Sequence, residues 1–194
     1  MKKFLGSNKL KTAVFISGTG SNLKSLIKFS LKKKSPIKIN FIISSNSKAN
    51  GLKYAIKFKI KRKIYDYKNK QKDENLILKQ LKKKDIGLIC LAGFMKILSN
   101  NFIKKFNGII LNIHPSLLPN YKGLNTHERV IQNKEKFSGC TVHFVSSKLD
   151  SGKIVLQKKV RVNKTDTPKK LSKKILKQEH ILYPRAIMKL FANL

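Results

Sequence analysis

Apolar residues recur along the first half of the chain in two alternating patterns. Short runs of consecutive apolar residues, such as Ala13–Ser17 and Ile86–Leu91, are typical of buried strands. Between such runs, segments like 23–31 place apolar residues at helical spacing. The patterns predict strands at 13–17, 37–44, 60–65, 86–91 and 108–113, and helices at 23–31, 49–58, 75–84 and from the N-cap Ser99 to 106.

This alternation predicts an α/β fold, a Rossmann-like, mostly parallel twisted sheet with helices on both faces. After His114 the regular alternation of predicted strands and helices ends. A short helix is expected at 126–133, followed by strands at 139–145 and 153–162 that a turn joins, which predicts an antiparallel extension in the C-terminal part. Thr167–Pro168 then opens a final helix with proline at its first position.

A polar pair ends the fifth predicted strand. Asn112 and His114 are two positions apart, so the period of a strand puts both side chains on one side. Pro115 and Pro119 stiffen the loop that follows. A fixed amide beside an imidazole can hold a developing oxyanion and supply a proton, which makes this pair the candidate catalytic group.

A glycine loop, Gly18–Asn22, joins the first strand to the first helix. Its backbone N–H groups and the helix behind them form an anion site. The loop does not fit a dinucleotide, because Leu23 stands where a third glycine is needed and Ser44–Asn46 carries no acid after the second strand. A phosphate monoester fits better; the alternative is a tight turn whose glycines serve geometry alone.

Asp150 lies in the turn between the two C-terminal strands. An aspartate there is commonly a turn former, and the alternative is a carboxylate aimed at His114 that raises its pKa. His143 falls within a strand, and we interpret it as a packing residue. The four histidines match no metal-ligand spacing, so no metal is predicted.

Composition excludes several classes of protein. With 41% hydrophobic residues the chain is not a disordered tail, and no apolar run reaches the length of a membrane span. Residues 1–9 lack the apolar stretch of a secretory signal. Cys90 and Cys140 have no paired spacing, which favours a reducing cytoplasm.

The formal net charge of +35 comes from 44 Lys and Arg residues against nine Asp and Glu. Such an excess keeps a nucleic-acid binder under consideration. However, lysine is spread along the whole chain together with abundant Asn, Ile and Phe, a mixture that AT-rich codons produce. We therefore interpret the charge mainly as codon drift, and expect no nucleic-acid partner, although it would attract anionic metabolites.

Five segments in order resemble phosphoribosylglycinamide formyltransferase, a folate-dependent formyltransferase family of purine synthesis. The resemblance runs from about Ala13 to Leu190. It rests on segments 16–23, 91–98, 112–119 and 149–152, and on Gln178–His180 with Tyr183–Pro184. It divides one domain, 1–194, into a phosphate-binding half at about 12–110 and a folate-binding and catalytic half at about 111–194.

The resemblance implies a role for each segment. Asn112, His114 and Asp150 would be the catalytic trio, with Asn112 also touching the folate's formyl group. Substrate glycinamide ribonucleotide would bind Gly20, Ser21, Asn22 and Glu179, and folate would bind Met95, Lys96, Ile97 and Leu98. The formyl donor would be 10-formyltetrahydrofolate, a co-substrate, with no metal.

Three other functions stay open at this point. Methionyl-tRNA formyltransferase shares the Asn-His-Asp chemistry, and a formyltetrahydrofolate deformylase would use water as the acceptor. A basic nucleic-acid-binding protein would leave the trio idle. We expect small-molecule partners, no membrane, a monomer or weak homodimer, and a cytoplasmic location.

Overall fold

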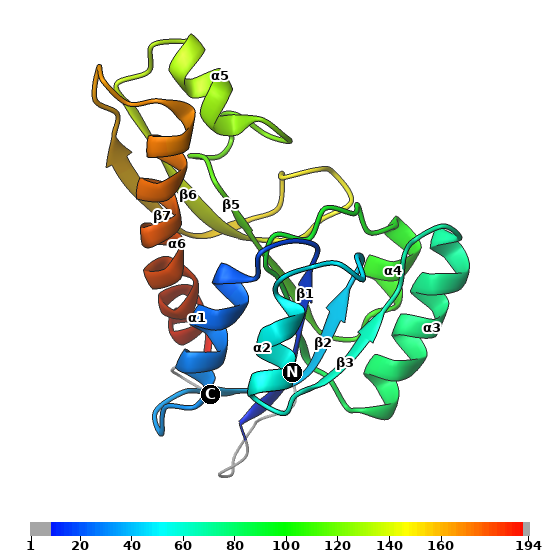
Figure 1. Ribbon diagram of the computed structural model, residues 1–194. Helices are drawn as coiled ribbons and strands as arrows, with labels where there is room; N and C mark the ends of the chain where they lie inside the picture. Colours follow the sequence, from blue (N-terminus) through cyan, green and yellow to red (C-terminus); the bar gives the residue numbers. More distant parts are fainter. Residues whose placement is uncertain (1–8, 192–194) are drawn as a thin grey trace.

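One seven-stranded sheet organises the chain in the computed structural model, which describes residues 9–191. The strands are β1 (Leu10–Ile16), β2 (Ile37–Ser44), β3 (Lys61–Ile64), β4 (Leu88–Leu91), β5 (Ile109–His114), β6 (Phe137–Phe144) and β7 (Ile154–Arg161). The helices are α1 (Ser21–Ser30), α2 (Leu52–Lys57), α3 (Lys70–Lys83), α4 (Asn100–Lys105), α5 (Thr126–Gln132) and α6 (Pro168–Phe191). Figure 1 shows their arrangement.

The strand order is β3-β2-β1-β4-β5-β6-β7. Strands β1 to β5 are parallel, whereas β6 pairs antiparallel with β5 and with β7. The predicted mostly parallel sheet with an antiparallel C-terminal extension is confirmed. The order reverses between β1 and β4, and ligands of open α/β sheets bind outside the carboxyl ends of the strands at such a point. The loops after β1 and β4 therefore border the expected site.

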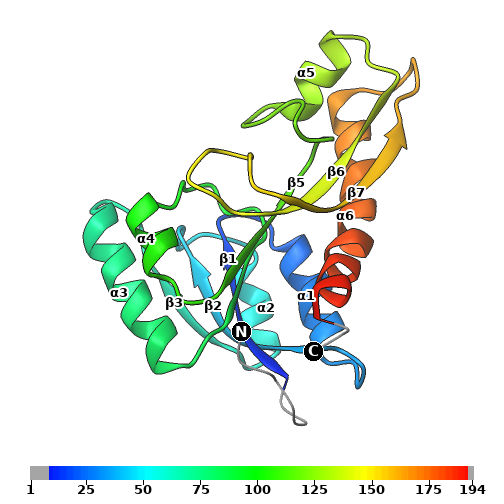
Figure 2. The ribbon, with the colours of Figure 1, turned by 180° about the vertical axis from the view of Figure 1, so that it is seen from behind.

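Helices cover both faces of the sheet, as the continuous apolar strands predict. Along β1, Val14 and Ile16 belong to one buried cluster, while Ala13 and Phe15 belong to the other. Helices α1, α2, α5 and α6 pack on the first cluster, and α3 and α4 on the second. Figures 1 and 2 show α1 beside α6 on one side and α3 with α4 on the other.

Helix α3 begins earlier than predicted and helix α6 contains an internal proline, each for an identifiable reason. Helix α3 begins at Lys70 instead of Asn75, because the Asn69 side chain caps it by accepting a hydrogen bond from the Lys72 N–H at 3.0 Å. Helix α6 continues through Pro184, which cannot donate to the carbonyl of His180 one turn earlier. That carbonyl instead accepts from Ser25 Oγ at 2.8 Å, so α1 replaces the lost bond.

Among the helices described in residues 9–191, none is long and apolar enough to cross a membrane.

Candidate active site

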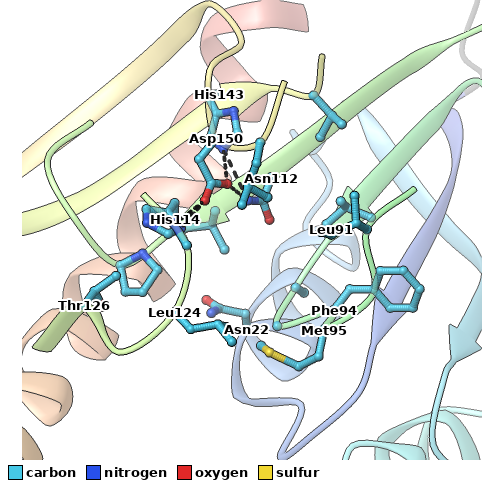
Figure 3. Close-up of a pocket in the computed structure, with 18 of the residues that line it drawn as sticks. Asn22, Leu91, Phe94, Met95, Asn112, His114, Leu124, Thr126, His143 and Asp150 are labelled. Atoms are coloured by element: carbon cyan, nitrogen blue, oxygen red, sulfur yellow. Dashed lines mark hydrogen bonds and ion pairs between the residues drawn. The ribbon is translucent and has the colours of Figure 1, made fainter. Parts of the chain in front are cut away.

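A cleft of about 630 Å³ opens at the carboxyl ends of the parallel strands. The glycine loop after β1 and the segment after β4 form one side of it. The end of β5, the segment 123–128, the loop that leads to Asp150 and one face of α6 form the rest. The predicted phosphate loop, folate segment and catalytic pair therefore share one cavity (Figure 3).

Asn112, His114 and Asp150 come together at one wall of this cleft (Figure 3). Asn112 Nδ2 donates to Asp150 Oδ1 at 3.4 Å, and His114 Nδ1 lies 3.4 Å from Asp150 Oδ2. The two β5 side chains face the same way, as strand periodicity predicts. Asp150 reaches them from a left-handed backbone conformation with φ of 45°. Of the two interpretations of Asp150, the structure therefore fits the one in which the turn carboxylate is aimed at His114.

The environment of Asp150 favours its ionised form. Burial alone would raise the pKa of this carboxyl, but the His143 side chain beside it, the hydrogen bond from the Gly123 N–H and the nearby His114 hold the pKa below its usual value. The Gly123 N–H donates to Oδ2 at 2.9 Å. Asp150 is therefore a fixed negative charge at neutral pH.

His114 is held on both sides of its ring. Its Nε2 lies 2.8 Å from the Tyr121 carbonyl, which can only accept, so Nε2 carries a proton and Nδ1 faces Asp150. The side chain is buried, and that burial lowers the pKa of His114 below its ordinary value. The Tyr121 carbonyl and Asp150 act in the opposite direction but do not outweigh it.

This result corrects part of the expectation for the trio. Asp150 does favour imidazolium, as predicted, but the net shift of the pKa of His114 is downward because the ring is desolvated. The ring is mostly neutral at pH 7 before any substrate binds. A neutral ring beside a fixed carboxylate is prepared to accept a proton and to be stabilised once it has done so.

His143 belongs to the same cluster, which the sequence did not reveal. Its Nδ1 donates to the Phe144 carbonyl at 2.8 Å, so Nε2 can accept from Asn112 Nδ2 at 3.2 Å. Nε2 also lies 3.6 Å from Asp150 Oδ1. The signal that could have found it is register, since Asn112 pairs with His143 across β5 and β6. The packing interpretation of His143 was therefore incomplete.

The glycine loop ends where α1 begins. The first helical hydrogen bond runs from the Lys24 N–H to the Gly20 carbonyl at 2.9 Å, which leaves the preceding N–H groups without a partner in the helix. Ser21 and Asn22 line the cleft beside them. Unpaired N–H groups at a helix start attract an anion, which fits the predicted phosphate site.

Glu179 of α6 meets this loop across the cleft wall. Asn22 Nδ2 donates to Glu179 Oε2 at 2.7 Å. Burial raises the pKa of Glu179, although the bond from Asn22 opposes the shift. The structure thus brings together Asn22 and Glu179, which only the family resemblance had linked.

Gly20 has a structural reason to be glycine. It has φ of +73°, and a Cβ there would lie 2.4 Å from the Gly51 Cα. We expect Gly20→Ala to lower the free energy of unfolding by about 1–3 kcal/mol, because backbone must shift and the left-handed conformation is strained. Chemical denaturation measures this, with Gly18→Ala as the control, since a Cβ at Gly18 meets nothing within 4 Å. Equal losses in both variants would contradict the explanation.

The segment after β4 presents apolar side chains to the cleft. Met95 and Ile97 are each 64% exposed, although both line the cavity, and Lys96 lies between them. Leu98 is buried and anchors the segment. An exposed apolar wall of this kind suits a flat, partly apolar ligand.

Across residues 9–191, no three His, Cys, Asp or Glu side chains gather in a way that could hold a metal ion.

Comparisons with known proteins agree with this geometry. A family described as formyl transferase matches residues 10–187. Phosphoribosylglycinamide formyltransferase of Haemophilus influenzae is 40% identical over 180 residues, covering 91% of this chain and 85% of that protein. The crystal structure of phosphoribosylglycinamide formyltransferase from Brucella melitensis is 40% identical, with a TM-score of 0.89 over 95% of this chain and 96% of that one.

A longer relative also matches. The human trifunctional purine biosynthetic protein adenosine-3 is 42% identical over 182 residues, which are 92% of this chain but 18% of that protein. This chain therefore spans less than a fifth of the trifunctional relatives' length.

Proposed function

The chain belongs to the formyl transferase family, and on that premise we propose that it moves the formyl group of 10-formyltetrahydrofolate to the amine of glycinamide ribonucleotide. The products are formylglycinamide ribonucleotide and tetrahydrofolate, in the synthesis of purine nucleotides. The observation that carries the proposal is the single cleft in which an anion-binding loop faces the cluster of Asn112, His114 and Asp150.

The two substrates occupy opposite ends of the cleft. The ribonucleotide phosphate binds the N–H groups at the start of α1, beside Ser21 and Asn22, and Glu179 accepts from the glycinamide amine. Folate lies against the wall of Met95 to Leu98, where backbone groups meet the pteridine ring. This placement brings the formyl group to Asn112. The pairing of Asn22 with Glu179 and the exposure of the apolar wall support it.

Transfer begins when the neutral amine attacks the formyl carbon. A carbon–nitrogen bond forms and the formyl oxygen becomes an oxyanion, to which Asn112 donates from Nδ2. Asn112 Nδ2 contacts His143 Nε2 at 3.2 Å and Asp150 Oδ1 at 3.4 Å. The longer contact, with Asp150, breaks when the oxyanion forms, because Asp150 keeps its hydrogen bond from the Gly123 N–H at 2.9 Å. The intermediate then collapses, the bond to folate N10 breaks, and N10 takes a proton.

His114 carries the proton between these two nitrogens. It starts mostly neutral because burial lowers its pKa, so it accepts the proton that the amine loses, directly or through water. The imidazolium that results is stabilised by Asp150 and then gives the proton to N10. Orientation and electrostatics are the protein's contribution, since the folate brings the formyl group.

The acceptor separates this proposal from its rivals. Purified protein is incubated with 10-formyldideazafolate, whose conversion is followed by absorbance, alone or with glycinamide ribonucleotide or initiator methionyl-tRNA. We expect turnover with the ribonucleotide only. Turnover without any acceptor would indicate a deformylase, and turnover with tRNA a methionyl-tRNA formyltransferase. No turnover, together with a salt-sensitive RNA gel shift, would indicate a nucleic-acid-binding protein.

The excess of lysine should speed the association of the protein with its substrates. Both are anionic, and the chain has a net charge of +35. We expect kcat/KM to fall as salt rises from about 0.02 to 0.15 M while kcat stays level, because salt screens steering but not the bound complex. Initial rates at several salt concentrations measure this. A kcat/KM that is independent of salt would leave codon drift as the sole explanation of the charge.

The partners that follow from this proposal are small molecules. We infer a monomer or weak homodimer that works in the cytoplasm. The two cysteines, Cys90 and Cys140, are free and buried, which agrees with a reducing compartment.

A further inference from the structure

Glu74 is a buried acid that the proposed chemistry does not use. The chain has only nine acidic residues, and four of those described are buried: Glu74, Asp150, Asp166 and Glu179. Asp150 and Glu179 belong to the cleft, and Asp166 pairs with Lys174 at 2.6 Å. Glu74 is 4% exposed and forms no ion pair within residues 9–191. A carboxylate buried without a cation needs other partners.

Those partners are at the end of the apolar wall. The Ser99 N–H donates to Glu74 Oε1 at 2.9 Å, and the Ser99 hydroxyl donates to Oε2. Ser99 in turn caps α4, because its Oγ accepts from the Phe102 N–H at 3.0 Å. Glu74, on α3, therefore fixes the residue at which the wall stops and the next helix starts.

The other end of the wall is held by Ser17. The Met95 N–H donates to Ser17 Oγ at 2.8 Å, and the Ser17 N–H donates to the Gly93 carbonyl at 3.0 Å. Ser17 Oγ also lies 2.6 Å from Ser45 Oγ, which connects it to the residue that directly follows β2. Ser17 directly precedes the glycine loop, so the two substrate-binding segments share this anchor.

Aromatic packing supports the wall from behind. The Phe94 ring packs edge to face against the rings of Phe15 and Tyr67, with distances of 5.3 Å and 5.6 Å between ring centroids. The segment 92–99 has no helix or strand of its own. Its shape therefore depends on these rings and on hydrogen bonds at its two ends, while Met95 and Ile97 stay free to meet a ligand.

We propose that Glu74 and Ser17 are positioning residues that hold the two ends of the Met95–Leu98 wall in the conformation that binds folate. This rests on the proposed function, in which the wall meets the pteridine ring. Neither residue touches the substrate. Both act through the backbone of the segment between them.

The test compares three substitutions in helix α3, which holds the Ser99 end of the wall. Glu74→Ala removes both bonds to Ser99 and should raise KM for the folate on the order of tenfold, the usual effect of losing a buried hydrogen-bonded tie. The KM for glycinamide ribonucleotide should change by less than about twofold. Glu74→Gln keeps an acceptor for the Ser99 N–H and can donate to its hydroxyl, so it should recover most of the folate affinity. Leu81→Ala is the matched control, since Leu81 is buried in the same helix and its side chain makes no hydrogen bond to the wall.

Thermal melting of each variant separates binding from stability. Leu81→Ala should lower the melting temperature at least as much as Glu74→Ala and leave the folate KM unchanged. Ser17→Ala provides a second route should Glu74→Ala fail to fold, and should also raise the folate KM. Wild-type protein that does not turn over the two substrates would contradict the proposed function itself. An active wild type whose Glu74→Ala and Ser17→Ala variants keep the folate KM, or whose Glu74→Gln variant recovers nothing, would overturn the positioning role alone.

Discussion

Replacing Asp150 with asparagine should lower kcat by about 10²–10⁴-fold at pH 7, with little change in either KM. Asp150 Oδ2 lies 3.4 Å from His114 Nδ1, and in the proposed mechanism its charge stabilises the imidazolium that forms during transfer. Asparagine keeps the shape but not the charge. The pKa of His114, already lowered by burial, should fall further, so the acidic limb of the pH profile should move to lower pH. Steady-state kinetics from about pH 5 to 9 measure both effects.

Two further variants show whether the pair acts as a unit. His114→Ala should cost a similar factor, and the double variant little more than either single one, because each loss disables the same proton transfer. Asp166→Asn is the matched control, a buried acid outside the cleft. Losses that multiply, or an Asp150→Asn protein that keeps most of its activity, would show that Asp150 is a turn residue and that another acid is needed.

Replacing Glu179 with glutamine should make the protein more stable and a poorer enzyme. Burial raises the pKa of Glu179, so between the pKa values of the unfolded and folded states the folded protein holds a proton that the unfolded chain has released, and above that range it carries a buried charge. Glu179 therefore contributes to the stability of the folded protein at low pH, and this contribution is lost as the pH rises through the pKa of Glu179 in the folded state. Glutamine keeps an acceptor for Asn22 Nδ2 without a charge to bury, so the melting temperature at neutral pH should rise. Activity should fall, because the amine loses its anionic acceptor, and KM for the ribonucleotide should rise by about 10–100-fold.

Asp166 supplies a control of opposite sign. Burial would raise the pKa of Asp166, but hydrogen bonds from Lys174 and the Asn163 N–H hold it below its usual value. Its contribution is present above the ordinary pKa of aspartate and is lost as pH falls. Asp166→Asn should therefore lower the melting temperature at neutral pH and leave both KM values alone. Melting curves from pH 4 to 8 would contradict the assignment if Glu179→Gln were destabilising throughout that range.

Local chemistry explains which parts of this fold were predictable from sequence. Strand β2 has the predicted bounds, 37–44, because Ile37 and Ile39 alternate with polar residues after Pro36 and the buried apolar run Phe41–Ile43 follows them. Ser99 was correctly expected to cap its helix, since the serine side chain supplies the missing acceptor. The start of α3 was missed because its first turn is polar and only the Asn69 cap marks it.

The site shows a similar division. Asn112 and His114 are two residues apart, so strand periodicity alone places them together. His143 comes to Asn112 through antiparallel register, and Glu179 to Asn22 across 157 positions of sequence, which no local pattern specifies. Whether the pKa of His114 shifts up or down depends on how deeply the folded protein buries the ring. The spacing of residues in the sequence does not determine that burial.

Isotope transfer tests the proposed reaction most directly. The protein is mixed with 10-formyltetrahydrofolate labelled with ¹³C in the formyl group, and glycinamide ribonucleotide and initiator methionyl-tRNA compete in the same sample. Carbon NMR and mass spectrometry then locate the label. We expect it in the amide of formylglycinamide ribonucleotide, and we expect the transfer to be lost in His114→Ala. Label recovered as free formate or on the tRNA, or transfer that His114→Ala leaves intact, would contradict the assigned acceptor or the assigned site.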